Sequence, residues 1–142
     1  MSQDFYLGNP NLKKVGTEIQ FTKEQIQEYL RCKEDPVYFA MNYIKIISLD
    51  EGIVPFKMWD FQQELIESFH ENRFNIAKLP RQTGKSTTCV SYLLHYILFN
   101  DNVNVGILAN KLSTARDLLG RLQLAYEQLP MWLQQGIVVY NK

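Results

Sequence analysis

One short stretch of the chain combines residue types that bind phosphate groups. Gly84, Lys85 and Ser86 stand between an apolar segment at residues 74–79 and an apolar run at residues 87–99. A strand, a tight turn and a helix in this order form a phosphate-binding loop, whose backbone N–H groups and positive helix end face an anion. There Lys85 would reach the β- and γ-phosphates of a nucleotide, and the Ser86 hydroxyl would ligate Mg²⁺.

The loop departs from the full phosphate-binding pattern at one position. That pattern, G-x-x-x-x-G-K-[ST], would place a glycine where Leu79 stands. The missing glycine argues against kinases and small GTPases and favours motor ATPases whose loop carries an arginine, here Arg81. A glycine-containing turn with a solvated Lys85 is the alternative interpretation.

Several neighbours of the loop are further candidates for nucleotide binding. Arg81 lies where a γ-phosphate would be, so it could neutralise charge that grows in the transition state; a salt bridge or a ground-state phosphate clamp is the alternative. Gln82 and Thr83 complete the loop before Gly84. The Thr87 hydroxyl could contact the α-phosphate or simply begin the helix.

A second candidate segment precedes the loop by about twenty residues. Trp59-Asp60-Phe61-Gln62-Gln63 contains a glutamine, whose amide both donates and accepts hydrogen bonds and therefore suits the N6 and N7 edge of adenine. The ring of Phe61 could stack on the base. Packing of a helix face is the default interpretation, and only the position relative to the loop favours Phe61 and Gln62 as adenine contacts.

The elements that would position these residues alternate in type. Thr22 and Gln25 form a capping box, and Asp35-Pro36 is a typical helix start. We expect helices at residues 22–32, from 35, 59–71, 87–99 and 113–129, a hairpin of strands at 44–49 and 53–56, and strands at 74–79, 103–109 and 137–140. Strands and helices in this order predict an α/β fold with a parallel sheet and ligands at the carboxyl ends of its strands.

Length and composition restrict the class of protein. The chain has 142 residues, is 46% hydrophobic, and carries 15 basic and 15 acidic residues for a net charge of 0. We expect an extended, mobile arm at residues 1–21 and part of one domain at residues 22–142. No apolar run approaches a membrane span, the N-terminus lacks signal-peptide features, and two cysteines have no metal or disulfide spacing. These features predict a soluble protein made in a cytoplasm.

The assembled residues resemble a known family. The chain is similar to the large terminase subunit of tailed bacteriophages, the ATPase of the DNA-packaging motor, and most closely to its myovirus branch. The likeness covers nearly the whole chain and is carried by Tyr6–Lys13, Trp59–Gln62, Arg81–Thr87, Val105–Lys111, Leu129–Pro130 and Gly136–Val138. The loop with an arginine and no first glycine is fairly specific to this family, whereas the other segments would be weak alone.

The resemblance implies a fold and an activity. It implies a P-loop NTPase of the ASCE, RecA-like class that forms a homo-oligomeric ring and uses ATP and Mg²⁺ to drive double-stranded DNA into a procapsid. The portal protein and the small terminase subunit are the implied partners, and the implied location is the cytoplasm of the infected host cell, outside the mature virion. In that family the residue matched by Arg81 has a catalytic or sensor role, and those matched by Phe61 and Gln62 contact adenine.

Part of the family pattern is not present in these 142 residues. No apolar strand ending in Asp-Glu follows the loop, so the aspartate that helps to hold Mg²⁺ and the glutamate that activates water are missing. The coupling motif and the nuclease domain that makes full-length members endonucleases are missing as well. We therefore expect the N-terminal part of an ATPase with an incomplete sheet and an N-terminal helical and hairpin extension, weak nucleotide binding and negligible turnover.

Two other functions fit the same residues. A superfamily 2 helicase or translocase also uses an upstream glutamine and a P-loop, although its loop usually keeps the first glycine. A non-catalytic module that binds a partner of the motor would show no dependence on ATP. The sequence after residue 142 would separate terminase from helicase, and a nucleotide titration would identify an interaction module.

Overall fold

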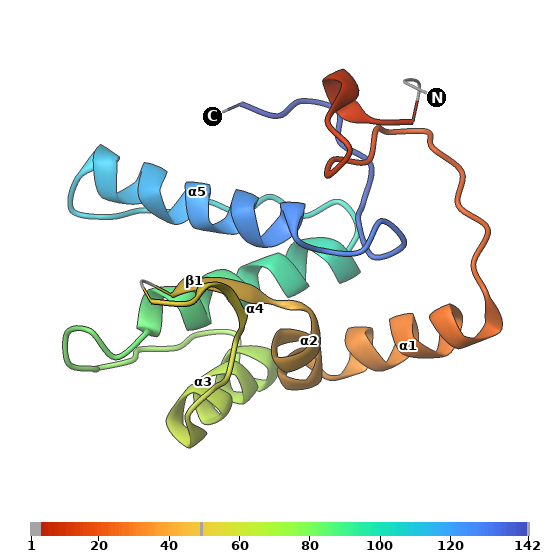
Figure 1. Cartoon of the computed structure of the whole chain (residues 1–142). Helices are drawn as coiled ribbons and strands as arrows, with labels where there is room; N and C mark the ends of the chain where they lie inside the picture. Colours follow the sequence, from red (N-terminus) through yellow and green to blue (C-terminus); the bar gives the residue numbers. More distant parts are fainter. Residues whose placement is uncertain (1–3, 49, 142) are drawn as a thin grey trace.

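The computed structural model describes residues 4–48 and 50–141 as a set of helices packed around one central helix, with a small hairpin at the edge (Figure 1). The central helix is α4, which packs against α2, α3 and α5. The elements in chain order are the 3-10 turn Tyr6–Gly8, α1 (Lys23–Glu34), α2 (Pro36–Tyr43), β1 (Lys45–Ser48), β2 (Gly52–Pro55), α3 (Asp60–Glu71), α4 (Lys85–Phe99) and α5 (Leu112–Glu127).

The first two helices begin where their capping residues predict. The backbone N–H of Gln25 donates to the Thr22 hydroxyl, and the backbone N–H of Thr22 donates to the Gln25 amide oxygen, which completes the capping box of α1. Asp35 ends α1 and starts α2, because its carboxylate accepts from the backbone N–H of Tyr38 at 2.8 Å. Pro36 then occupies the first turn, where its missing N–H costs nothing. Both helix starts are confirmed.

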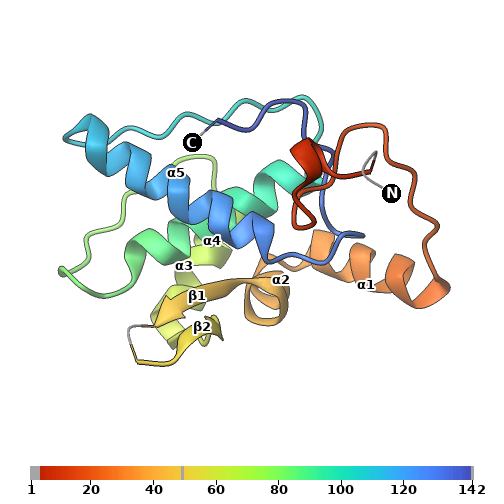
Figure 2. The same ribbon diagram turned by 45° about the horizontal axis from the view of Figure 1, so that its top comes forward.

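The expected hairpin is also present. β1 and β2 are antiparallel, with Ile46 opposite Val54 and Ile47 opposite Ile53. Gly52, which opens β2, has φ +74, a left-handed conformation that a turn can require and that glycine adopts without strain. Figure 2 shows this hairpin at the edge of the helical body. The predicted strand residue Leu49 lies outside the described residues.

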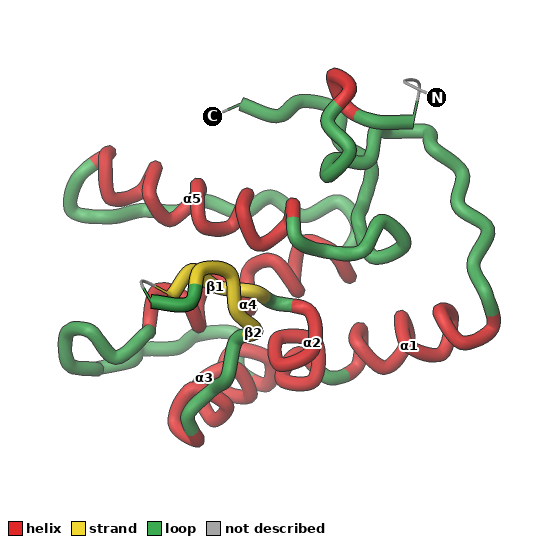
Figure 3. Tube along the Cα trace, in the orientation of Figure 1, coloured by secondary structure: helices red, strands yellow, loops and turns green. Residues whose placement is uncertain are grey.

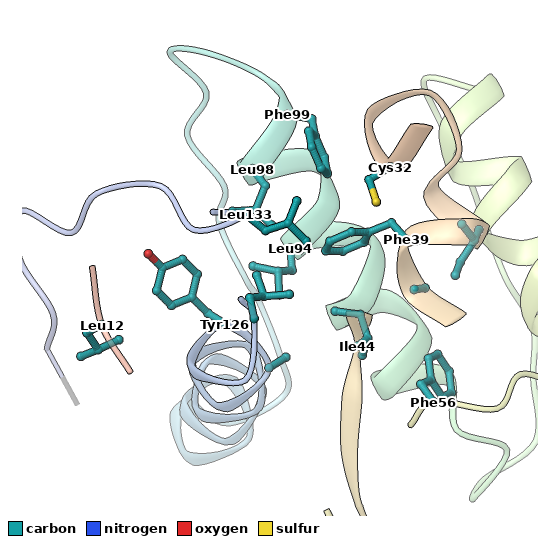
Figure 4. Packing of buried hydrophobic residues seen from close by; sticks show 14 residues of the cluster. Leu12, Cys32, Phe39, Ile44, Phe56, Leu94, Leu98, Phe99, Tyr126 and Leu133 are labelled. Atoms are coloured by element: carbon teal, nitrogen blue, oxygen red, sulfur yellow. The ribbon is translucent and has the colours of Figure 1, made fainter. Parts of the chain in front are cut away.

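The hydrophobic core lies around α4, as its wide apolar face predicts. Phe39 of α2 is at its centre, with the rings of His95 and Phe99 at 5.5 and 5.6 Å between centroids. Figure 4 shows Phe39 between Leu94 and Cys32. Core residues come from every helix: Leu12, Cys32, Phe39, Ala40, Ile44, Phe56, Ile66, Leu94, Leu98, Phe99, Ala125, Tyr126, Leu129 and Leu133. Burial of this apolar surface, about 25 cal/mol per Å², is the main force that holds the helices together.

The N-terminal arm has fixed neighbours, which a mobile tail lacks. Leu12 is 3% exposed and belongs to the core. Lys14 forms a parallel bridge with Ile137, and the backbone N–H of Tyr140 donates to the Tyr6 hydroxyl. The buried Gln134 side chain accepts from the backbone N–H of Lys13 and donates to three backbone carbonyls. Residues 5–15 therefore pack along the C-terminal segment.

At Gly136 the C-terminal segment is packed directly against the backbone of the arm. A Cβ atom there would lie 2.5 Å from the Val15 Cα, which is backbone and cannot turn aside. We expect Gly136→Ala to lower the free energy of unfolding by about 1–3 kcal/mol through overpacking and to speed amide exchange at Val15 and Ile137. Urea unfolding and hydrogen exchange measure the two effects. Gly120→Ala in α5 is the matched control, because a Cβ there meets no atom within 4 Å and alanine favours a helix.

The three segments expected to form a parallel sheet have no strand partner within residues 4–48 and 50–141. Residues 74–79 and 103–109 connect helices as extended coil (Figure 3), and Ile137 has only its single bridge to Lys14. In the described residues the β1–β2 pair is the one sheet. A strand is stable only when neighbouring strands bond its backbone, and no such neighbour is in place here. The parallel α/β sheet therefore stays a prediction.

Candidate phosphate-binding loop

The loop before α4 has a backbone shaped by two left-handed residues. Gly84, the residue that caps α4, has φ +72 and ψ 13, and Gln82 has φ +62. A left-handed conformation is natural for glycine but strained for glutamine, and such strain concentrates at functional loops. Conformations of alternating hand turn successive N–H groups toward one side, which makes a concave site for an anion. The local geometry is therefore that of an anion cradle.

The backbone amides of this loop have no hydrogen-bond acceptor among the residues that the structure describes. Within the ranges 4–48 and 50–141, no backbone N–H from residues 81–87 donates a hydrogen bond to another described residue. The first N–H groups of any helix lack an intrahelical acceptor, and they carry the positive end of its dipole. Residues 81, 82 and 84 are exposed, and residues 83 and 85–87 are half-buried, so solvent reaches this part of the chain. They are available to an anion.

Lys85 lies over the same loop. Its ammonium donates to the Pro80 carbonyl at 3.0 Å, and the Thr83 hydroxyl donates to that carbonyl at 3.0 Å as well. A lysine ammonium has three N–H donors, so two remain for a ligand. The Pro80 carbonyl thus holds both the Thr83 hydroxyl and the Lys85 ammonium, and it occupies only one of the three N–H donors of the ammonium. The sequence showed no signal for this role of Pro80.

Ser86 and Thr87 occupy the first turn of α4 and are half-buried. The Ser86 hydroxyl has no hydrogen-bond partner among the described residues and stands one residue after Lys85. Thr87 lines a cavity of about 280 Å³ between α4, α5 and β1, whose walls include Lys45 and Arg121. Arg81 lies exposed in the loop, three residues before Gly84. The structure therefore brings Arg81, Lys85 and Ser86 to one end of α4.

Thr88 in the first turns of α4 is bonded to the end of the loop. It was not among the predicted site residues. It is fully buried, and both its backbone N–H and its hydroxyl donate to the Gly84 carbonyl, at 3.0 and 3.1 Å. This double contact fixes the last peptide of the loop to the first turn of α4. The hydroxyl of a threonine in a helix can donate to the carbonyl four residues earlier. The position of Thr88, four residues after Gly84, could therefore have predicted this contact.

Phe61 and Gln62 meet the loop from α3. Gln62 is 3% exposed, and its amide nitrogen donates to the Thr83 carbonyl at 3.3 Å. Its amide oxygen accepts from the backbone N–H of Trp59 at 2.9 Å, so Gln62 also caps α3. Phe61 is half-buried beside it. The predicted proximity of this segment to the loop is present, whereas its contact with adenine stays a prediction.

Other kinds of functional feature are not evident in the described part of the chain. There, no three His, Cys, Asp or Glu side chains gather at distances that could hold a metal ion. No helix within the same ranges has both the length and the apolar character needed to cross a membrane. No protein-family model matches the sequence.

Proposed function

We propose that this chain is the ATP-binding part of a viral DNA-packaging motor of the large terminase type. In this proposal the full motor couples ATP hydrolysis to translocation of double-stranded DNA into a procapsid, as a ring that engages the portal protein and the small terminase subunit. It acts in the cytoplasm of the infected host cell. ATP and Mg²⁺ are its cofactors, and this chain alone turns over negligibly.

The observation that carries the proposal is the set of unpaired amides at the start of α4. The backbone N–H groups of residues 81–87 donate to no residue within 4–48 and 50–141, and several of these residues are exposed, so the donors are free to exchange water for a ligand. The positive end of a 15-residue helix and the adjacent Lys85 ammonium select an anion. A phosphate chain supplies acceptors along the length of such a loop.

The fit of a Mg²⁺–triphosphate to these residues follows from their donor types. The amides of residues 82–87 and the Lys85 ammonium would hold the β- and γ-phosphates, and the free Ser86 hydroxyl would hold the cation. Arg81 would neutralise negative charge at the γ-phosphate from its exposed place in the loop. Mg²⁺, when bound, lowers the charge repulsion between phosphate oxygens. The residues present are therefore suitable for the cofactor.

The parallel sheet belongs to the same proposal. Apolar side chains of the three unpaired segments are exposed to solvent, with Phe74 at 83%, Ile76 at 101% and Leu108 at 93%. Val138 and Val139 are exposed as well. Neighbouring apolar side chains on an unpaired backbone are rare on the surface of a complete domain. They are typical of strands whose neighbouring strands are not in place. We infer that these segments join a parallel sheet in the assembled motor.

The position of two of these segments supports the sheet. Asn75 of the first segment and residues 104–106 of the second line one hollow of about 680 Å³. Tyr92 and Tyr96 of α4 form part of the same wall. The two segments therefore lie over one face of α4, as strands packed on a helix do.

Binding of a triphosphate to the loop tests the function. We titrate the chain, labelled with ¹⁵N, with Mg²⁺–ATP and with tripolyphosphate, and follow the amide signals by NMR. The expected result is weak saturable binding, with a Kd between about 0.1 and 10 mM, and the largest shifts at residues 81–87. Sulfate at equal ionic strength is the control, because it carries charge without the length of a triphosphate.

Two outcomes would remove the proposal. Shifts confined to residues outside the loop would show that the phosphate binds elsewhere by charge alone. No shift up to about 10 mM ATP would favour the non-catalytic interaction module instead. A terminase and a helicase share the expected result, and the sequence that follows residue 142 separates them.

A further inference from the structure

The Gln62 side chain joins two elements that are far apart in sequence. It belongs to α3, and its amide nitrogen bonds to the carbonyl of Thr83, a residue 21 positions later in the phosphate-binding loop. It is 3% exposed, although glutamine is usually at the surface. A buried amide is stable only when its donors and acceptors are satisfied, so these two contacts determine where the side chain lies.

The orientation of the amide is fixed by its partners. The Trp59 N–H can only donate, so it requires the amide oxygen of Gln62, and the Thr83 carbonyl can only accept, so it requires the amide nitrogen. The amide oxygen and the amide nitrogen each use one hydrogen-bonding position on the protein, which fixes the side chain at a place that is 3% exposed. A base could reach the remaining N–H or lone pair only if this buried side chain left its place between the helix start and the loop.

Gly84 shows that the loop is packed directly against this amide. A Cβ atom on Gly84 would lie 2.6 Å from the Gln62 amide nitrogen, and the φ of +72 there also disfavours any other residue. The peptide that ends the loop thus has Gln62 on one side, and Thr88 holds its carbonyl on the other at 3.0 and 3.1 Å. The loop is held between α3 and α4.

We propose that Gln62 is a positioning residue that keeps the loop amides in the arrangement a phosphate chain needs, and not a reader of the base. The inference rests on the proposed function, since it takes the loop as the phosphate site. Its consequence is that removing the Gln62–Thr83 contact weakens binding of every triphosphate by the same factor, whatever its base.

Gln62→Glu separates the two contacts. A carboxylate still accepts from the Trp59 N–H, and glutamate suits this position of a helix start, so the cap of α3 is kept. It cannot donate to the Thr83 carbonyl, and two oxygens now face each other. Gln63→Glu is the matched control: it adds the same charge on the next residue, and its side chain has no hydrogen bond among the described residues.

The measurements are affinity for Mg²⁺–ATP, Mg²⁺–GTP and tripolyphosphate, amide exchange of the free protein, and the midpoint of urea unfolding. For Gln62→Glu we expect all three affinities to fall by a common factor of about three to ten relative to Gln63→Glu. Exchange at residues 83–86 should rise by a similar factor. The unfolding midpoint should fall below that of the control, because a carboxylate at this 3% exposed position faces the Thr83 carbonyl without a donor, so the affinities are compared at temperatures and urea concentrations where both variants are folded.

Two results would overturn the inference. One is a loss of ATP affinity that spares tripolyphosphate, which would make Gln62 a base reader. The other is unchanged amide exchange at residues 83–86 in the free Gln62→Glu protein. The exchange measurement needs no ligand, so if the wild-type chain binds no triphosphate, the proposed function fails while the role of Gln62 in the loop is still decided.

Discussion

Lys85→Ala should weaken binding of Mg²⁺–ATP and of tripolyphosphate by about ten- to a hundredfold. The ammonium is the one cation that the structure shows bonded to the loop itself, at 3.0 Å from the Pro80 oxygen, among the described residues. A charge-assisted hydrogen bond to phosphate contributes about 1.5–3 kcal/mol, which gives this range. Titration calorimetry against both ligands measures it. The free energy of unfolding should change by less than about 0.5 kcal/mol, because Lys85 contributes little to the core.

Two control variants make the result specific. Lys33→Ala removes the same charge from an exposed residue in the last turn of α1, a helix that Figure 1 shows on the side of α2 away from the loop, and should leave both affinities within about twofold. Lys85→Arg keeps the charge but not the compact ammonium, so it should restore only part of the binding. Equal losses for Lys33→Ala and Lys85→Ala would show that the ligand responds to net charge and not to the loop.

Acid should destabilise this fold through one buried histidine. His95 is 2% exposed, and its Nε2 lies 2.8 Å from the Cys32 carbonyl oxygen, to which the neutral ring donates. Burial, with a smaller contribution from the nearby His70, lowers the pKa of His95 to about 4. The unfolded chain has the ordinary histidine pKa of about 6.5. Between these values the unfolded state binds a proton that the native state does not, so stability falls as pH decreases from 6.5 to 4.

The size of this effect follows from the two pKa values. A difference of about 2.5 units corresponds to roughly 3 kcal/mol, complete by about pH 4 and absent above pH 6.5. Urea unfolding at a series of pH values should show this slope, and His95→Gln should remove it, since glutamine can donate to the same carbonyl without titrating. His70→Gln, at an exposed position, should keep it. An identical slope in wild type and His95→Gln would contradict the assignment.

Local signals in the sequence predicted the helices and the hairpin. The starts of α1 and α2 are set by hydrogen bonds between capping side chains and nearby backbone groups, at Thr22 with Gln25 and at Asp35 before Pro36. These bonds are local, so the positions of both helices could be predicted without knowledge of the rest of the fold. The apolar face of α4 predicted a helix packed on several sides, and Leu94 and Leu98 are indeed buried. The helix caps depend on residues fewer than five positions apart, and the hairpin pairs residues at most ten positions apart.

The features that the sequence did not predict depend on distant residues. Nothing near Gln62 indicates that its amide reaches Thr83, and the packing of Leu12 and Gln134 joins the two ends of the chain. The parallel sheet is a third case. Residues 74–79 have the apolar composition of a strand. A strand forms only when a neighbouring strand bonds to its backbone, and the composition of one segment does not identify that neighbour.

The packing of the arm on the C-terminal segment has a consequence for how the protein is made. Tyr6 meets Tyr140 across 134 residues, and Gln134 meets Asn11 across 123. A ribosome adds about 5–20 residues per second, so Tyr6 is synthesised roughly 7 to 27 seconds before Tyr140. Leu12 therefore lacks part of its set of core neighbours during that interval, and the arm can pack on the C-terminal segment only after that segment has been made.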